Sequence, residues 1–208
     1  MNSYISKDYT NIMAKELIIT QDNLHLLQSL PTTLEVLHCS YNDLSSLPPF
    51  PSTLELLSCG SNNLVSLPIF PPILKELYCS DNNLTSLPPL PNTLEILICD
   101  NNNLTNLPSL PLTLKEFHCS NNNLTNLPIL PNKLEVLICN GNKLPEWYYT
   151  SNIQEIRNRQ IVEKLLLLRK KVATRIIQKA WTRYWYYPNS EGISRYSSYM
   201  SHLDLRVK

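Results

Sequence analysis

Cysteine is the residue type whose spacing in this chain most suggests chemistry. Six cysteines recur every 20 residues, at Cys39, Cys59, Cys79, Cys99, Cys119 and Cys139. On neighbouring strands of a parallel sheet they would lie about 4.8 Å apart, which permits a disulfide, whereas the full set would follow a line about 24 Å long, which does not suit one metal ion. Because Ile19 takes the equivalent position one repeat earlier, we expect reduced, buried thiols and a reducing compartment.

Histidine and glycine give no support for catalysis. His38 and His118 stand four repeats apart, about 19 Å on such a ladder, so they cannot act on one bond. No serine, cysteine or carboxylate surrounds them in a nucleophile arrangement. Gly60, Gly141 and Gly192 form no phosphate-binding loop. We therefore expect a protein that is not an enzyme and that binds no cofactor or metal.

A 20-residue repeat must position these residues. Its template, LxxLxCxxNxLxxLPx[LF]Pxx, begins at Leu34, Leu54, Leu74, Leu94 and Leu114, with a shortened copy from Leu134 and a degenerate copy from Ala14. Alternating apolar residues predict a short strand in which Leu37 and Cys39 face inward. Two prolines per unit, such as Pro48 and Pro51, predict an extended, polyproline-like return. One unit buries too little apolar surface to fold alone, so about seven must stack.

Asparagine follows the expected strand in six copies. The positions are Asn42, Asn62, Asn82, Asn102, Asn122 and Asn142, with Asp22 in the degenerate copy. An asparagine side chain donates and accepts hydrogen bonds, so stacked copies can form a ladder where the chain bends. Asparagine also tolerates left-handed backbone, which suits a chain with only three glycines.

The motif LxxLxCxxNxL resembles the core of the leucine-rich repeat family, with Cys at the third apolar position. The 20-residue unit with LPxLP is similar to repeats of secreted bacterial effectors. Some of those continue into a ubiquitin-ligase domain with a catalytic Cys, but no Cys follows Cys139, so that activity is not carried over. The Asn-rich repeats and the run IIQKAW also resemble short leucine-rich repeat proteins of giant viruses of amoebae (Mimivirus-like). The resemblance implies a solenoid whose concave sheet binds proteins, in the cytosol or a virion.

The outward strand positions are the candidate binding residues. A strand side that merely faces water should be polar, yet these positions carry Val, Leu, Ile and Tyr among two Glu and two His, which is typical of a protein contact. The alternative is that aliphatic residues simply favour strands. The candidates are Val36, His38, Tyr41, Leu56, Glu76, Tyr78, Ile96, Ile98, Glu116, His118, Val136 and Ile138. A third outward position reads Ser40, Gly60, Ser80, Asp100, Ser120 and Asn140.

The C-terminal part of the chain differs in charge. Residues 1–150 carry six Lys/Arg and 13 Asp/Glu, a net charge of −7, and residues 151–208 carry 12 and four, a net charge of +8. The stretch from Asn152 to Tyr187 has no Pro or Gly, so we expect a helix that Ser151 can cap and that Pro188 ends. Apolar residues recur along one side of it, at Ile153, Ile156, Ile161, Leu165, Leu168, Val172, Ile176, Ala180 and Tyr184.

A basic amphipathic helix of this kind is typical of membrane-surface and calmodulin targets. The basic residues expected to act there are Arg169, Lys170, Lys171, Arg175, Lys179 and Arg183. The spacing of Leu168, Val172, Ile177 and Trp181 fits a calmodulin-type anchor, although the IQ-like run that starts at Ile177 is incomplete. Nucleic acid or anionic lipid remains an alternative ligand, as does a purely structural helix that covers the open end of the solenoid. Opposite charges also predict that residues 151–187 bind the separated repeats in a salt-weakened way.

The sequence therefore predicts a leucine-rich repeat solenoid with short parallel strands on the concave face, an extended convex side and an α-helical tail. We divide it into a lead (1–13), about seven repeats (14–144), an aromatic cap with the basic helix (145–188) and a flexible end (189–208). No apolar run approaches the ~18 residues of a transmembrane segment and no signal peptide is evident, so we expect a cytoplasmic protein, in host cytoplasm if viral. The expected function is recognition of a protein partner by the concave face; the alternative is binding through the tail.

Overall fold

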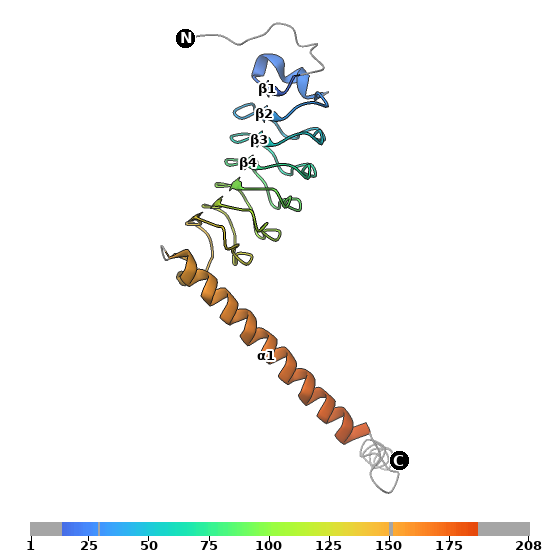
Figure 1. The fold of residues 1–208 in the computed structure, drawn as a ribbon, viewed down its shortest axis with the longest axis vertical. Helices are drawn as coiled ribbons and strands as arrows, with labels where there is room; N and C mark the ends of the chain where they lie inside the picture. Colours follow the sequence, from blue (N-terminus) through green and yellow to red (C-terminus); the bar gives the residue numbers. More distant parts are fainter. Residues whose placement is uncertain (1–13, 29, 150–151, 187–208) are drawn as a thin grey trace, which may run out of the picture. The chain divides into compact units, whose positions relative to one another are not determined.

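The computed structural model describes residues 14–28, 30–149 and 152–186 (Figure 1). Its strands are β1 (Glu16–Ile18), β2 (Val36–His38), β3 (Leu56–Ser58), β4 (Glu76–Tyr78), β5 (Ile96–Ile98), β6 (Glu116–His118) and β7 (Val136–Ile138). Two 3-10 helices, η1 (Gln21–Gln28) and η2 (Glu146–Tyr149), and one helix, α1 (Ile153–Tyr186), complete the described elements. The N-terminal lead expected at 1–13 and the C-terminal end expected at 189–208 lie outside the described residues, as do Ser151 and Pro188.

The strands form one parallel sheet in chain order, β1 to β7. Each pairs with the next at a register of one repeat, so that Leu57 faces Leu77 and Leu77 faces Leu97. Each strand has three residues, and in β2 to β6 the middle residue is buried while its neighbours are half-buried. From β2 to β7, each segment that leads back to the next strand contains prolines and no helix. Proline lacks the backbone N–H that an α-helix needs. The predicted solenoid, with its extended convex side and helical tail, is confirmed.

The core is a column of leucines and cysteines. Leu34, Leu54, Leu74 and their strand neighbours are fully buried, and Cys39, Cys59, Cys79, Cys99 and Cys119 have no exposed surface. All six cysteines are free thiols. Burial raises the pKa of the Cys39 and Cys79 thiols to about 12, so both stay protonated at neutral pH. The expectation of reduced core thiols is confirmed.

The buried asparagines tie each repeat to the one before it. Asn102 Nδ2 donates to the carbonyl oxygens of Cys99 in its own repeat and of Cys79 in the preceding repeat, at 3.3 and 3.0 Å. Its Oδ1 accepts from the backbone N–H of Leu84 at 3.0 Å. The same set recurs at Asn62, Asn82, Asn122 and Asn142, whereas Asn42 donates to Ile19 O and Ser40 O. Each side chain thus satisfies backbone groups at the bend after a strand.

Left-handed backbone falls one position before these asparagines. The residues with positive φ in this register are Tyr41, Ser61, Asp81, Asn101, Asn121 and Gly141. The buried asparagines therefore act as hydrogen-bonding groups rather than as left-handed residues, which corrects that part of the sequence interpretation. The degenerate first copy also differs, because Asp22 lies in η1 instead of in a tight bend, although Ile19 does enter the core at 3% exposure.

The chain divides into two compact units, and the boundary between them in the sequence follows Arg157. The first, called the repeat unit below, ends in η2 and the first turn of α1. Tyr148 is 2% exposed, its hydroxyl donates to Asn126 Oδ1 at 2.6 Å, and its ring stacks on Trp147. Asn152 Oδ1 accepts from the N–H groups of Gln154 and Glu155, so Asn152 caps α1.

In the second unit, the side chains of residues 161–179 of α1 are exposed. No described helix is long and apolar enough to cross a membrane.

Candidate functional site

The outward side chains of β2 to β7 form a continuous surface, called the concave strip below. It comprises residues 36, 38 and 40 and their equivalents at each further step of 20. The strip contains the predicted candidates Val36, His38, Leu56, Glu76, Tyr78, Ile96, Ile98, Glu116, His118, Val136 and Ile138. Parallel pairing at constant register places each candidate beside its equivalent on the next strand, about 4.8 Å away. With Glu16 and Ile18 of β1 included, the strip crosses all seven strands of the sheet, and its width is the length of one strand.

Tyr41 lies outside this strip. It sits in the turn after β2 with a φ of 62° and is 81% exposed. The structure therefore does not group it with the strand candidates, although its backbone N–H bonds to the carbonyl of Gly60.

Aliphatic side chains occupy much of the strip. Leu56, Ile96 and Ile98 are half-buried between their neighbours, and Val136 and Ile138 on the last strand are 41% and 40% exposed. In β5, both outward positions are isoleucine, which makes the centre of the strip apolar. An apolar centre with polar neighbours is the arrangement found in protein interfaces.

Polar groups flank that centre on both sides. On β4, the Tyr78 hydroxyl donates to Glu76 Oε2 at 2.8 Å. Burial, and secondarily this hydrogen bond, raises the pKa of Tyr78 to about 12, so the phenol stays neutral. On β6, His118 Nε2 lies 3.0 Å from Glu116 Oε1, and its Nδ1 lies 3.9 Å from Asp100 Oδ2 on the neighbouring rung.

The two histidines are not brought together. His38 lies on β2, with Nε2 3.8 Å from Glu16 Oε1, and His118 lies four strands away on β6. The imidazole of each contacts carboxylates, and Cys99 Sγ donates to the backbone carbonyl of His118 rather than to its ring. Within the described residues no three His, Cys, Asp or Glu side chains could hold a metal ion.

Salt bridges one repeat apart border the strip. The pairs are Lys15–Glu35 at 2.8 Å, Lys75–Glu55 at 2.7 Å and Lys115–Glu95 at 2.5 Å. The sequence interpretation did not identify them, although their spacing of 20 residues was a signal that could have. These border carboxylates are each paired with a lysine, whereas the strip has the carboxylates of Glu76, Asp100 and Glu116, and of Glu16 on β1, and has no lysine or arginine.

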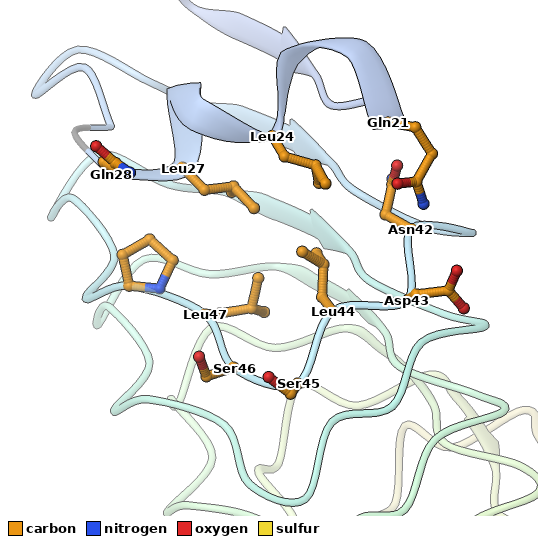
Figure 2. Close-up of a pocket in the computed structure, with 11 residues that line it drawn as sticks. Gln21, Leu24, Leu27, Gln28, Asn42, Asp43, Leu44, Ser45, Ser46 and Leu47 are labelled. Atoms are coloured by element: carbon orange, nitrogen blue, oxygen red, sulfur yellow. The ribbon is translucent and has the colours of Figure 1, made fainter.

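A shallow pocket of about 560 Å³ lies away from the strip (Figure 2). Leu24 and Leu27 of η1 form one wall, and Leu44 and Leu47 of the next turn form the other. Its polar rim includes Asn42, Gln21 and Asp43. It is open and holds no cluster of titratable groups, so it offers no catalytic arrangement.

The basic residues predicted for the tail lie in α1. Arg169, Lys170, Lys171, Arg175 and Lys179 are exposed; Arg183 is in the helix, with its side chain outside the described residues. Aliphatic residues of the same segment are also exposed, from Ile161 at 50% to Ile176 at 61%. They include Val162, Leu166, Leu167 and Ile177 in addition to the expected stripe.

Known proteins share this repeat. The family model described as Leucine Rich Repeat matches residues 73–92. No curated protein sequence matches the chain.

Solved structures of bacterial effectors are similar to the chain. YopM from Yersinia enterocolitica WA-314 is 41% identical over 54% of this chain and 25% of its own, with a TM-score of 0.53. YopM from Yersinia pestis, a leucine-rich effector protein, is 39% identical over 63% of this chain and 39% of its own, with a TM-score of 0.58. The leucine-rich repeat domain of a Shigella effector is 31% identical over 64% of this chain and 71% of its own, with a TM-score of 0.54.

The chain thus spans between a quarter and about two fifths of the length of the two YopM chains. It spans 71% of the Shigella domain. The 20-residue register, the parallel strand ladder and these matches agree: the chain belongs to the leucine-rich repeat family.

Proposed function

We propose that this protein is a non-enzymatic binding module that captures a protein partner on its concave strip. The leucine-rich repeat fold is typical of protein-interaction modules, and the strip is where the fold offers a continuous surface. The observation that carries the proposal is chemical: the outward side of β5 is Ile96 and Ile98, where a water-facing strand would be polar.

The surrounding groups suit recognition rather than turnover. Tyr78 and Glu76 hold each other in place by a hydrogen bond. His118 Nε2 lies 3.0 Å from Glu116 Oε1, which restricts both side chains in the same way. Side chains fixed before binding lose less entropy on association, so they favour specific contacts. The six core thiols support a reducing location such as the cytoplasm, of the host if the protein is viral.

The competing proposal is that the tail makes the contact, to a calmodulin-like protein, an anionic membrane or a nucleic acid, while the repeats serve as a scaffold. Exposed aliphatic and basic side chains along α1 are the observation that favours it. The two proposals place the binding residues in different units, so they can be separated by mutation.

A pull-down with two variants tests them. One variant replaces Tyr78, Ile98 and Ile138 on the strip with aspartate. The other ends at Arg157, because Ile156 is 1% exposed and Arg157 bonds to the last rung, so a cut at residue 151 would damage the repeat unit. We expect the truncated chain to retain the partner captured by the full chain and the strip variant to lose it. Loss from the truncated chain alone would contradict the proposal.

A further inference from the structure

The concave strip carries charge of one sign. Its carboxylates are Glu76, Asp100 and Glu116, together with Glu16 on β1, and no lysine or arginine lies among its side chains. Glu76 and Glu116 stand on β4 and β6, two strand spacings apart, which is about 10 Å. Between them lie Ile96 and Ile98 of β5. A ligand that fits this pattern has an aliphatic side chain between two cations about 10 Å apart.

The described part of α1 has that chemistry. In an α-helix each residue turns 100° and rises 1.5 Å, so Lys164 and Lys171 lie within about 20° of the same side and about 10 Å apart along the axis. Leu168 lies between them, and Arg175 continues the same side. Leu168 is 49% exposed and all three cations are exposed, so this face is free to bind.

The dimensions of the two surfaces also agree. Seven strands give the strip a length of about 29 Å, and three-residue strands give it a width of about 10 Å. Residues 161–179 of α1, whose side chains are exposed, are about 29 Å long, and a helix with its side chains is about 10 to 12 Å wide. One such helix laid across the strands would cover the strip from end to end.

We propose that the occupant of the concave strip is the basic helix of a second copy of this chain. This inference rests on the proposed function, because it names the partner of the same strip. Lys164 and Lys171 of one copy pair with Glu76 and Glu116 of the other, and Leu168 packs on Ile96 and Ile98. If each copy inserts its helix into the other, the two identical contacts close a symmetric dimer.

A second copy offers the basic residues of α1 on one continuous helix. α1 begins at Ile153 inside the repeat unit and continues to Tyr186 without a proline or glycine. The helix of a second copy can therefore bind along its length without unfolding.

The mass of the full chain in solution tests the proposal, measured by sedimentation velocity and light scattering at several concentrations and salt levels. We expect self-association that weakens at least about tenfold in dissociation constant between low salt and about 0.5 M salt, because exposed charges are screened. The strip variant Glu76→Lys/Glu116→Lys should be monomeric. The helix variant Lys164→Glu/Lys171→Glu/Arg175→Glu should be monomeric too. Lys170→Glu, about 120° away on the helix, should behave like the wild type.

Mixing the two charge-reversed variants provides the decisive control. Each has two surfaces of the same sign, so it cannot pair with itself, but in the mixture every basic surface meets an acidic one. We expect the mixture to recover the mass of the wild-type assembly. A wild-type chain that is monomeric at all concentrations, or a mixture that stays monomeric, would overturn the proposal. Those results would leave capture of another protein by the strip intact, since the pull-down measures it separately.

Discussion

Arg157 Nη2 lies 2.8 Å from the carbonyl oxygen of Leu134, on the last rung of the repeat unit. It also donates to Pro131 O at 2.7 Å. In several inner rungs a threonine from the following repeat has this role, as where Thr113 Oγ1 donates to the carbonyl of Leu94 at 2.7 Å. Arg157 therefore replaces the missing next repeat, and the first turn of α1 closes the solenoid at its C-terminal end.

Removing this guanidinium should destabilise the repeat unit. We expect Arg157→Ala to lower the free energy of unfolding by about 1–3 kcal/mol, because two carbonyl groups lose a charged donor. Urea unfolding followed by circular dichroism measures it. Arg159→Ala, which removes an exposed arginine two residues later, should change the free energy by no more than about 0.5 kcal/mol. Equal effects for the two variants would contradict the capping role.

The buried asparagine ladder makes a second prediction. Asn102 is 6% exposed and bonds to Cys79 O, Cys99 O and Leu84 N. Asn102→Ala removes the acceptor of the buried Leu84 N–H and one of the two asparagine donors to each of Cys79 O and Cys99 O, so we expect a loss of at least about 2 kcal/mol in the free energy of unfolding. The exposed neighbour offers a matched control, and Asn103→Ala should stay within about 0.5 kcal/mol of the wild type. A loss below about 0.5 kcal/mol at Asn102 would rule out the ladder as a major source of stability.

Gly141 and Gly60 differ in backbone conformation and in what an added side chain would meet. Gly141 has a φ of 68°, and a Cβ there would lie 2.1 Å from Asn121 Oδ1. Gly60 lies in ordinary backbone, and its nearest contact would be Ser80 O at 3.2 Å. We expect Gly141→Ala to cost about 1–3 kcal/mol and Gly60→Ala clearly less, in thermal or urea unfolding. A larger loss of stability for Gly60→Ala than for Gly141→Ala would contradict the described conformation of these turns.

The core thiols predict a loss of stability at high pH. Burial raises the pKa of Cys79 from 9.0 to about 12, so the folded state keeps a proton that the unfolded chain releases above pH 9. This contribution is complete below pH 9 and is lost as the pH rises towards 12. Between pH 9 and 10.5, we expect the wild type to lose about 1–2 kcal/mol more than Cys79→Ala. Parallel pH profiles of the two proteins in urea unfolding would contradict the burial of this thiol.

Much of the fold follows from the sequence because one spacing controls it. Each Cys marks an inward strand position and each proline pair a turn back, so the template predicts strands at 36–38 and every 20 residues after. The partners of the Asn amides could not be predicted, since Asn102 reaches a carbonyl 23 residues earlier in the chain. The left-handed residues were also missed, because their identity varies from Tyr41 to Gly141 and follows no residue type.

The sequence also predicts only part of the candidate binding site. The alternation of inward and outward positions predicts the strip, but it cannot show that Tyr78 bonds to Glu76 or that Lys115 pairs with Glu95, which depends on side-chain direction. At the helix, the sequence predicts an amphipathic element. It does not show that α1 starts within the repeat unit, because Arg157 meets its carbonyls through tertiary contact.

Thiol reactivity tests the central claim most directly, namely that the repeats stack with cysteines inside and the strip outside. Native protein treated with a thiol reagent at neutral pH should show none of its six cysteines reacting on the time scale of mixing, because all are buried. The variant Ser58→Cys, which adds a thiol to the outward side of β3, should react with one equivalent. Rapid reaction of all six native thiols, or none from Cys at position 58, would contradict the stacking and the binding surface together.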